Sequence, residues 1–451
     1  MNSPVASSAG SLRPMLRLAL PALAEQSLVM LIGFSDTLLT GRYLEEQHLA
    51  AIGLMSYLLW FFHTLFQTVG IGALAMVARY IGAGDPETAR RVTHQAVLIG
   101  AVFAVVVVAG IALFSDQLVA AMRLRGESAE LAARFVRGQL PALPLIMLQA
   151  VGIYCLRGAG DMMAGLKVMG TVNLVNIAVS WSLVRGIGPL PQLGWDGLVI
   201  GTCCGESVGG LMVLWFLYRG RAGLKLEWRL LRPDWKLIER MLRIGIPGGA
   251  DMMLMVGCHL AFLGMINDLG DLAAAAHGVA VRIESLSYLP GAAFQMAAAT
   301  LAGQFLGARD PHRATRSVTM ACAVGGGIMV TAGLTFYLFA NQLTWLFLDE
   351  GQTDVHHLAA RLLRIVAFSQ PALAVAMILT GALRGAGDTR WPLVFTLIGL
   401  AGIRLPLAWL MADWLDLGVA GAWYAMVIDL YLRCGLITGR FLHGGWKRVK
   451  V

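Results

Sequence analysis

An aspartate stands inside an otherwise apolar stretch of this sequence, LIGFSDTLLTGR at residues 31–42. An ionised side chain in the centre of a lipid bilayer costs about 2.5–3.5 kcal/mol, so an acid kept in such a run is a candidate site for binding a proton or a cation. Asp36 also lies roughly 14 Å beyond the centre of its run, near the hydrocarbon edge, where an acid can reach water. A coupling acid and an interfacial acid are both compatible with the residues alone.

Four further ionisable residues in apolar runs are candidate cavity residues or charge partners: Glu25, Asp251, Arg282 and Glu284. Glu25 and Asp251 each follow a proline by four residues, so a symmetric structural role, such as hydrogen bonding to a proline-broken backbone, and substrate contact are both open. Arg282 and Glu284 are two residues apart and point to nearly opposite faces of a helix. Arg282 is expected either in a cavity, biasing the protonation of a carboxylate, or in a structural ion pair.

The cysteine and histidine pattern indicates no further chemistry. The 6 cysteines fall in apolar runs without a CxxC pair, so we expect neither a disulfide framework nor a metal site. His259 and His277 are the histidines nearest to a helix interior, and a role in packing is expected for both. No convergent group of His, Asp or Cys of the kind an enzyme needs is evident. The sequence therefore predicts neither catalysis nor a metal or cofactor.

The elements that position these residues are predicted to be membrane-spanning helices. The chain has 451 residues, of which 57% are hydrophobic and only 14% are charged, which excludes an ordinary soluble domain. Crossing the hydrocarbon takes roughly 20 apolar residues. Twelve such runs are present, at 15–39, 49–78, 92–114, 129–157, 165–184, 194–219, 240–267, 272–305, 317–340, 355–384, 391–411 and 418–440. Candidate kink points are Pro141, Pro144, Pro290 and Pro371.

Charge placement predicts the orientation of the chain. Most of the 35 Lys and Arg residues fall in segments on the side of the two termini. The positive-inside rule therefore predicts a multi-pass protein of the plasma (inner) membrane with both termini cytoplasmic. The net charge of +8 then faces anionic lipid headgroups, and no nucleic-acid partner is expected. A monomer surrounded by membrane lipids is the expected state.

The chain also repeats itself. ARYIGAGDP at 78–86 matches GQFLGARDP at 303–311, and LRGAGD occurs at 156–161 and again at 383–388. These spacings are close to half the chain, which predicts two six-helix bundles related by a pseudo-two-fold axis along the membrane normal. In the repeated loops, Gly ends a helix, Asp caps the next one and Arg sits at the interface. The expected parts are a tail at 1–14, an N-lobe at 15–219, a linker at 220–239, a C-lobe at 240–440 and a tail at 441–451.

The order of these motifs carries a family resemblance. FSDTLLTGR, GAGDP, RGAGD, RIESLSYLPGAAFQMAAATLAGQFLGARDP and RGAGDTRWPLVFTLIGLAGIRLPLAWL together resemble the multidrug and toxic compound extrusion (MATE) family, most closely its DinF-like prokaryotic branch, over residues 15 to 448. The resemblance implies an all-α fold of two six-helix bundles around a cavity that opens alternately to either side. It implies an antiporter that expels amphipathic, often cationic compounds in exchange for inward protons or sodium, with no cofactor.

The resemblance also assigns roles to residues. Asp36 matches the coupling acid, which related proteins carry in this FxDT context. Related members often have NIxLDP on the fifth helix, where this chain has NIAVSW, so Asn176 matches and Ser180 replaces an acid. Thr202 on the sixth helix matches a cavity-facing threonine.

Glu206 lies four residues after Thr202, on the same helix face. We expect Glu206 to supply the lost negative charge toward Asp36, Asn173, Asn176 and Ser180, and the alternative is pairing with an arginine at a helix end.

The C-terminal half lacks the sodium ligands of the family's NorM-like branch. The matching positions are Met255 and Leu373, neither of which can ligate a hard cation, so proton coupling through the N-lobe is favoured over sodium. Substrate contacts are expected from flexible or aromatic side chains, which suit cationic amphiphiles. These are Tyr57, Met252, Met255 and Tyr288. A MATE-like exporter or flippase of a specific lipid, peptide or metabolite is the alternative function.

Overall fold

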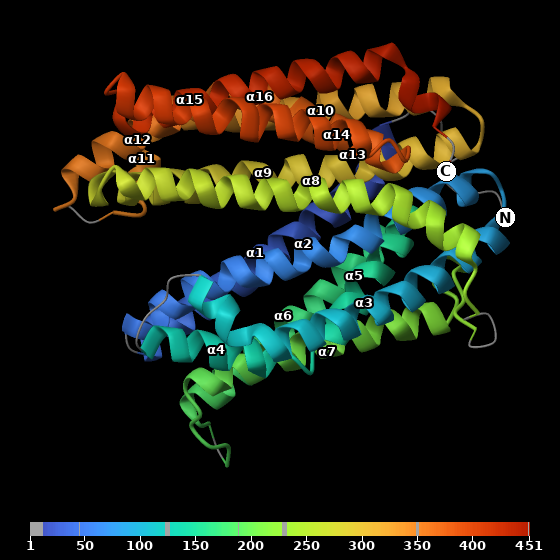
Figure 1. Cartoon of the computed structure of the whole chain (residues 1–451), viewed down its shortest axis with the longest axis horizontal. Helices are drawn as coiled ribbons and strands as arrows, with labels where there is room; N and C mark the ends of the chain where they lie inside the picture. The colour runs from blue at the N-terminus through green and yellow to red at the C-terminus, as the bar shows by residue number, and fades with distance from the viewer. Residues whose placement is uncertain are drawn as a thin grey trace. The chain divides into compact units, whose positions relative to one another are not determined.

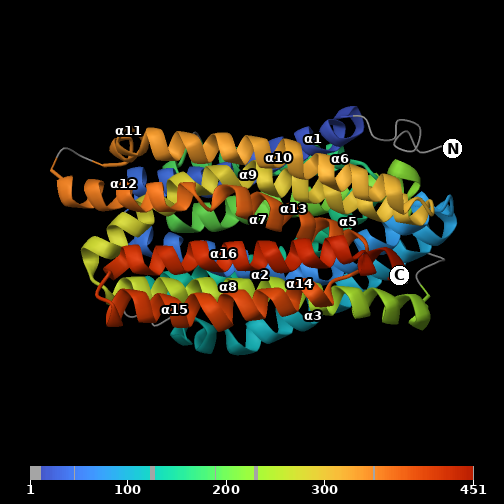
Figure 2. The same ribbon diagram turned by 90° about the horizontal axis from the view of Figure 1, so that it is seen from above.

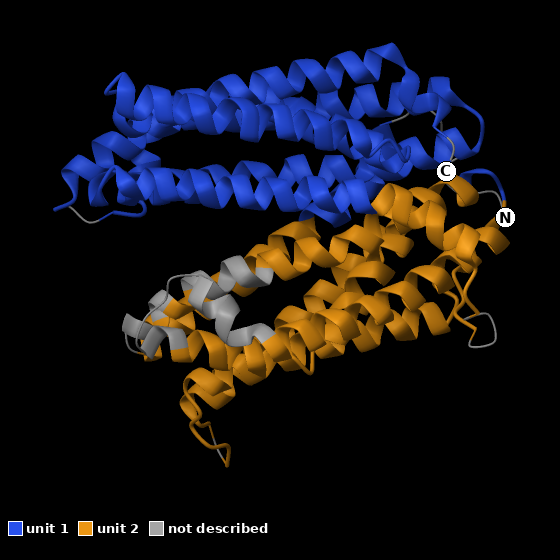
Figure 3. Ribbon diagram, viewed as in Figure 1, with its two compact units in different colours: residues 1–23, 82–84, 246–451 blue, residues 24–81, 85–245 orange. Residues whose placement is uncertain are grey.

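The computed structural model describes residues 12–44, 46–121, 127–187, 189–227, 232–348, 351–449 and 451, and over these residues every regular element is a helix. The helices gather into two compact units, shown in Figure 3. Unit 1 comprises residues 1–23, 82–84 and 246–451, and unit 2 comprises residues 24–81 and 85–245.

Unit 2 holds most of the first set of helices, coloured blue to green in Figure 1. They are α1 (Leu12–Tyr43), α2 (Glu46–Gly82), α3 (Pro86–Ala121), α4 (Glu127–Gln139), α5 (Leu143–Gly158), α6 (Met162–Arg185) and α7 (Trp195–Tyr218). The short helix η1 (Arg221–Gly223) follows.

Unit 1 repeats this order of elements. Its helices are α8 (Trp235–Asp268), α9 (Asp271–Gly307), α10 (Pro311–Leu338), α11 (Ala340–Trp345), α12 (Thr353–Ala367), α13 (Gln370–Gly385), α14 (Arg390–Thr396), η3 (Leu397–Arg404), α15 (Leu405–Trp409), η4 (Leu410–Trp414), α16 (Gly418–His443) and η5 (Gly445–Arg448). Figure 2 shows α9, α10 and α13 packed side by side. The second helix has 37 residues in both sets, α2 and α9, as an internal repeat requires.

In the described part of the chain, nine helices are long and apolar enough to cross a membrane. Two bent pairs bring the number to eleven: α4 with α5, at 62°, and α12 with α13, at 54°. The 37-residue α9 covers the predicted run 272–305 but is not among these eleven, so the described residues give eleven of the twelve expected spans. Pro141, Pro144 and Pro371 fall at the two bends, as expected for kink points, whereas Pro290 lies inside a continuous α9.

Both long helices that open a repeat are divided between the units. The boundaries fall after Leu23 in α1 and after Gly245 in α8, and not in the preceding connections. Close packing of α8 on α2 accounts for the second boundary. A Cβ added to Gly72 would lie 2.3 Å from the Met241 carbonyl oxygen, and one added to Gly245 would lie 2.3 Å from that of Thr68. The first three turns of α8 therefore belong to the packing of unit 2.

A stripe of glycines brings α6 and α7 together. Gly197, Gly201, Gly205 and Gly209 recur every four residues on one face of α7. A Cβ at Gly201 would lie 2.0 Å from Ser180 Oγ, and a Cβ at each of the others would also fall within 3.0 Å of α6 or α5 atoms. Small residues at this spacing let helix backbones approach closely inside a membrane. Thr202 and Glu206, which follow Gly201 and Gly205, are thereby brought close to the neighbouring helices.

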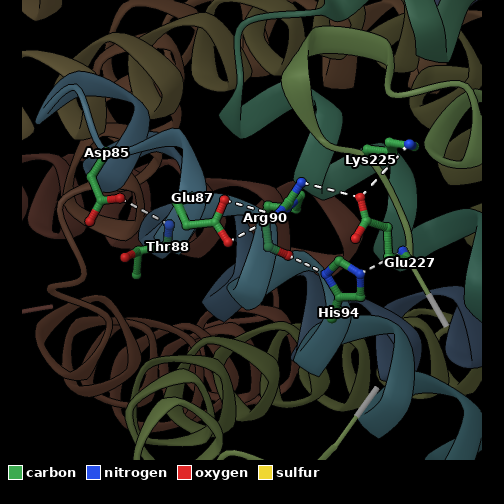
Figure 4. A network of polar contacts seen from close by, with 7 residues as sticks. All are labelled: Asp85, Glu87, Thr88, Arg90, His94, Lys225 and Glu227. Atoms are coloured by element: carbon green, nitrogen blue, oxygen red, sulfur yellow. Dashed lines mark hydrogen bonds and ion pairs between the residues drawn. The ribbon is translucent and has the colours of Figure 1, made fainter. Parts of the chain in front are cut away.

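The connection from α7 to α8 is held against the start of α3 (Figure 4). The imidazole of His94 donates from Nδ1 to the Arg90 carbonyl oxygen at 2.7 Å and accepts at Nε2 from the Glu227 backbone N–H at 2.8 Å. The Arg90 guanidinium also lies 3.4 Å from the Glu227 carboxylate. Gln95 adds bonds to the Arg232 carbonyl oxygen and the Asp234 backbone N–H.

Candidate functional site

Asp36 is buried inside unit 2. Its side chain lies on α1 with 6% of its surface exposed, facing the Asn176 amide of α6 and the Thr202 hydroxyl of α7. An acid that drew its stability from headgroup water would be exposed, so this burial does not fit an interfacial acid. Three helices thus converge on one carboxylate.

The polar residues of α6 and α7 form the walls of this site. Asn173 Nδ2 donates to the Leu28 carbonyl oxygen at 3.0 Å and to the Met169 carbonyl oxygen at 2.8 Å, which ties α6 to α1. Asn176 Nδ2 donates to Thr202 Oγ1 at 3.3 Å, which ties α6 to α7. These bonds use the Nδ2 atoms of both asparagines, so each amide oxygen is left free of them.

Glu206 also belongs to this group. It lies one turn after Thr202 with 7% of its surface exposed, and its charge acts on Asp36. Its carboxylate accepts a hydrogen bond from Gln149 Nε2 of α5 at 3.1 Å, and His63 of α2 is the basic group that acts on it. Within the described residues, the side-chain partner of Glu206 is thus Gln149 and not a helix-end arginine.

Buried oxygen atoms without a hydrogen-bond partner concentrate here. Within the described part of the chain they include Asp36 Oδ1, Gln149 Oε1, Asn173 Oδ1, Asn176 Oδ1 and Ser180 Oγ. Nearly all buried polar atoms in proteins have partners, so such a group calls for an explanation. Carboxylate, amide and hydroxyl oxygens accept hydrogen bonds or bind hard cations. The site is therefore suited to a proton, to water or to a small cation.

Each of the two acids that follow prolines, Glu25 and Asp251, forms an ion pair with an arginine. Arg157 Nη2 lies 2.6 Å from Glu25 Oε1 in unit 2, and Arg384 Nη2 lies 2.5 Å from Asp251 Oδ2 in unit 1. Both arginines belong to the repeated RGAGD motif. The symmetric role anticipated for Glu25 and Asp251 is thus an ion pair rather than a bond to the broken backbone. Arg157 is buried in that pair and does not lie at the surface.

The remaining candidates are spread over α8 and α9. Glu284 is buried with 5% of its surface exposed, whereas Arg282 is exposed, in agreement with their expected opposite faces. Tyr288 is 38% exposed, and Met252 and Met255 are half-buried. The side chain of Tyr57 lies outside the described residues.

The two histidines expected to be packed both make internal contacts. His259 Nδ1 donates to the Met255 carbonyl oxygen of its own helix, and His277 Nδ1 accepts from Trp423 Nε1. The sequence missed Gln149, His63 and a group of ion pairs on α16. Gln149 and His63 carried no signal of their own, because a single polar residue in an apolar run does not reveal which helix it faces.

Known proteins resemble this chain over nearly its whole length. A family profile described as MatE matches residues 21–182 and 247–410. A probable multidrug resistance protein NorM of Thermotoga maritima is 28% identical over 437 residues, covering 97% of this chain and 93% of that protein. A probable multidrug resistance protein YoeA of Bacillus subtilis is 25% identical, covering 94% and 91%.

Solved structures show the same fold. The outward-facing conformation of a multidrug resistance MATE family transporter of the MOP superfamily superposes with a TM-score of 0.91 at 21% identity, covering 100% of this chain and 99% of that one. A MATE crystallised in complex with MaL6 also reaches 0.91, with both chains fully covered. Since the family profile covers well over half of the residues and the duplicated helices follow the same order, this multi-pass membrane protein belongs to the MatE family.

Proposed function

We propose that the protein is a multidrug efflux antiporter, which exports amphipathic, often cationic compounds in exchange for protons by alternating access. The names of its relatives, multidrug resistance proteins NorM and YoeA, support efflux of drugs as the activity. The proposed setting is the plasma (inner) membrane with both termini cytoplasmic, where the topology follows the positive-inside rule. Export driven by an ion gradient needs neither a cofactor nor an enzymatic step, and a monomer suffices.

The observation that carries this proposal is the buried Asp36 among unpartnered oxygen atoms. A carboxylate away from water favours its neutral form, while nearby hydrogen-bond donors favour its charged form. Asp36 has both influences, because it is buried beside the polar groups of Asn176 and Thr202, and Glu206 adds a repelling charge. Such a carboxylate can take up a proton from one side of the membrane and release it to the other.

Substrate and proton then compete for the same acidic region. A cationic compound is attracted to Asp36 and Glu206 when they are ionised and is released when they are protonated. Because the amide and hydroxyl groups are fixed by bonds between helices, protonation changes the charge of the site without dismantling it. Sodium at Asp36 remains the competing coupling ion, since the oxygen donors suit either.

Dye transport in inverted vesicles tests the proposal. With a pH gradient, wild-type vesicles are expected to accumulate ethidium and to lose it when a protonophore is added, whereas Asp36→Asn vesicles accumulate none. Glu239→Gln is the matched control, because Glu239 is an exposed acid of α8 in a surface pair with Arg243. Equal transport by wild type and Asp36→Asn would exclude Asp36 as the coupling site. Transport that follows a sodium gradient and ignores the protonophore would replace the proton by sodium. A transporter that ignores cationic dyes and moves a lipid or peptide would replace the substrate class.

A further inference from the structure

A second group of buried charges lies in unit 1, on helices that the proposed coupling site does not use. Asp429 of α16 is fully buried, with 0% of its surface exposed, between two arginines. Arg404 donates from both Nε and Nη2 to Asp429 Oδ2, each at 2.9 Å. Arg433 donates from Nε to Oδ1 and from Nη2 to Oδ2, also at 2.9 Å. One carboxylate therefore holds two guanidinium groups.

Local backbone features bring together Arg404, Asp429 and Arg433, a group called the clamp below. Arg404 ends the π-helical segment η3, two residues before Pro406, which cannot donate a backbone hydrogen bond. Gly399 opens room for α16, because a Cβ there would lie 2.2 Å from Asp429 Oδ1 and 2.4 Å from Arg433 Cγ. The glycine thus lets the backbone of η3 approach Asp429, and Arg404 at the end of the same segment reaches Asp429 with its guanidinium.

The clamp has one positive charge in excess. Arg404 and Arg433 carry two charges, and Asp429 neutralises one of them. Glu284 of α9 is the further acid near this group, because the Arg404 charge interacts electrostatically with its carboxylate. Tyr288, one turn after Glu284, interacts electrostatically with Glu284 and with all three residues of the clamp. An ionised Glu284 makes the group neutral overall, and a protonated Glu284 leaves it with one positive charge.

Glu284 differs from the other buried acids of unit 1 in having no ion pair. In the described part of the chain, Asp251, Asp388 and Asp429 each lie within 3.0 Å of an arginine nitrogen, and Glu284 is not in any such pair. Tyr288 on the same helix is influenced by Glu284 and by the charges of Arg404, Arg433 and Asp429. His259 of α8 is influenced by the same two arginines and by Asp429. Among the described side chains of α10, α12 and α13, which also pack on α9, none acts on the Glu284 carboxylate.

We propose that Glu284 is a second proton-exchanging carboxylate of the transport cycle, with Arg404, held by Asp429, as its charge partner. The inference rests on the proposed antiport and adds a proton site in unit 1 to the one at Asp36 in unit 2. Two opposing influences allow the exchange: burial favours the neutral acid, and a guanidinium that is not in direct contact favours the ion. A direct ion pair would hold the carboxylate charged, as it does for Asp429.

Infrared difference spectroscopy on purified protein, recorded as the pH is lowered, tests this site without any substrate. Wild type is expected to gain carboxylic-acid C=O bands, one of which is lost in Glu284→Gln and a different one in Asp36→Asn. In vesicles, Glu284→Gln is expected to carry one proton fewer per exported dye molecule than wild type.

The outcomes separate this site from the proposed one. If Glu284→Gln shows the same set of bands as wild type at every pH, the inference is overturned. If Asp36→Asn matches wild type while Glu284→Gln loses a band, the proposed coupling site fails and the second site stands. Should Glu284→Gln not fold, Glu284→Asp decides, because a shorter acid at this position must shift the band, and an unshifted band also overturns the inference.

Discussion

The Arg157 guanidinium lies 2.6 Å from the Glu25 carboxylate, and the same pair recurs in the other half of the chain as Arg384 with Asp251 at 2.5 Å. Each pair joins the helix that opens a repeat to the RGAGD turn that follows the bent helix pair. Gly165 makes the approach possible, since a Cβ there would lie 2.3 Å from Glu25 Oε2. The duplication thus preserved a buried contact as well as the turns.

Removing one member of this pair is expected to destabilise the protein strongly. Glu25→Gln leaves the buried Arg157 charge without its counter-ion, which costs about 3–5 kcal/mol. Thermal unfolding of the purified variant, followed by tryptophan fluorescence, measures the loss. Glu239→Gln is the control, because its partner Arg243 and Glu239 itself are both exposed and such pairs contribute at most about 1 kcal/mol.

A double-mutant cycle then separates the pair from its surroundings. Glu25→Leu combined with Arg157→Met is expected to lose less stability than the sum of the single changes, since the double variant leaves no unpaired charge. Additive losses would mean that the two side chains act independently.

The glycine stripe of α7 predicts a contrast between two alanine substitutions. Gly201→Ala places a Cβ 2.8 Å from the Ser180 backbone nitrogen and 2.0 Å from Ser180 Oγ, so α6 and α7 must separate. Overpacking of this kind costs about 1–3 kcal/mol. Gly327→Ala in α10 meets nothing within 4 Å and is expected to stabilise its helix by up to about 1 kcal/mol.

Both variants are compared with wild type in unfolding temperature and in dye transport. A Gly201→Ala protein as stable and as active as Gly327→Ala would show that the close approach of α6 and α7 is dispensable.

The sequence predicted those features that local chemistry decides. Asp161 accepts from the Ala164 backbone N–H at 3.1 Å and Asp310 from that of Arg313 at 2.9 Å, so the repeated aspartates cap helices as expected. The order of the helices and two of the bends followed from apolar runs and prolines. The grouping of Asn176 with Thr202 and Asp36 followed from the family resemblance.

Contacts that depend on how a helix is rotated could not be predicted. Helices that are apolar on most faces give no amphipathic pattern from which to read a rotation, so the Gln149 partner of Glu206 was missed. The Arg404 clamp was missed for another reason. A π-helical turn inserts an extra residue, and a projection with 3.6 residues per turn then places the following side chains on the wrong face.

The two hydrogen bonds of His94, a clasp that holds the connection between α7 and α8 against α3, predict a change in protease sensitivity. His94→Ala removes both the acceptor of the Glu227 N–H and the donor to the Arg90 carbonyl oxygen. The connection, rich in Lys and Arg, is then expected to be cut by trypsin faster in the variant, by roughly tenfold for each 1.4 kcal/mol of lost local stability. Exposed His443 provides the control, as His443→Ala leaves this region unchanged. Equal cutting rates in all three proteins would contradict a clasp.

Asp85 predicts a stability difference that depends on pH. Its Oδ1 accepts from the Thr88 backbone N–H at 3.0 Å at the start of α3. The Thr88 side chain, and after it this backbone bond, lowers the pKa of Asp85 below its ordinary value. The ionised carboxylate therefore stabilises the folded state, fully so above the ordinary aspartate pKa of about 3.9, and the contribution is lost as the pH falls through the lower native pKa. Asp85→Ala is expected to cost about 1 kcal/mol near neutral pH. Asp85→Asn, whose amide oxygen still caps the helix, costs less. Unfolding temperatures measured over a pH series should show the gap between wild type and Asp85→Ala narrowing in acid. A gap of constant size down to the lowest pH would mean that the charge of Asp85 contributes nothing and that its length alone matters.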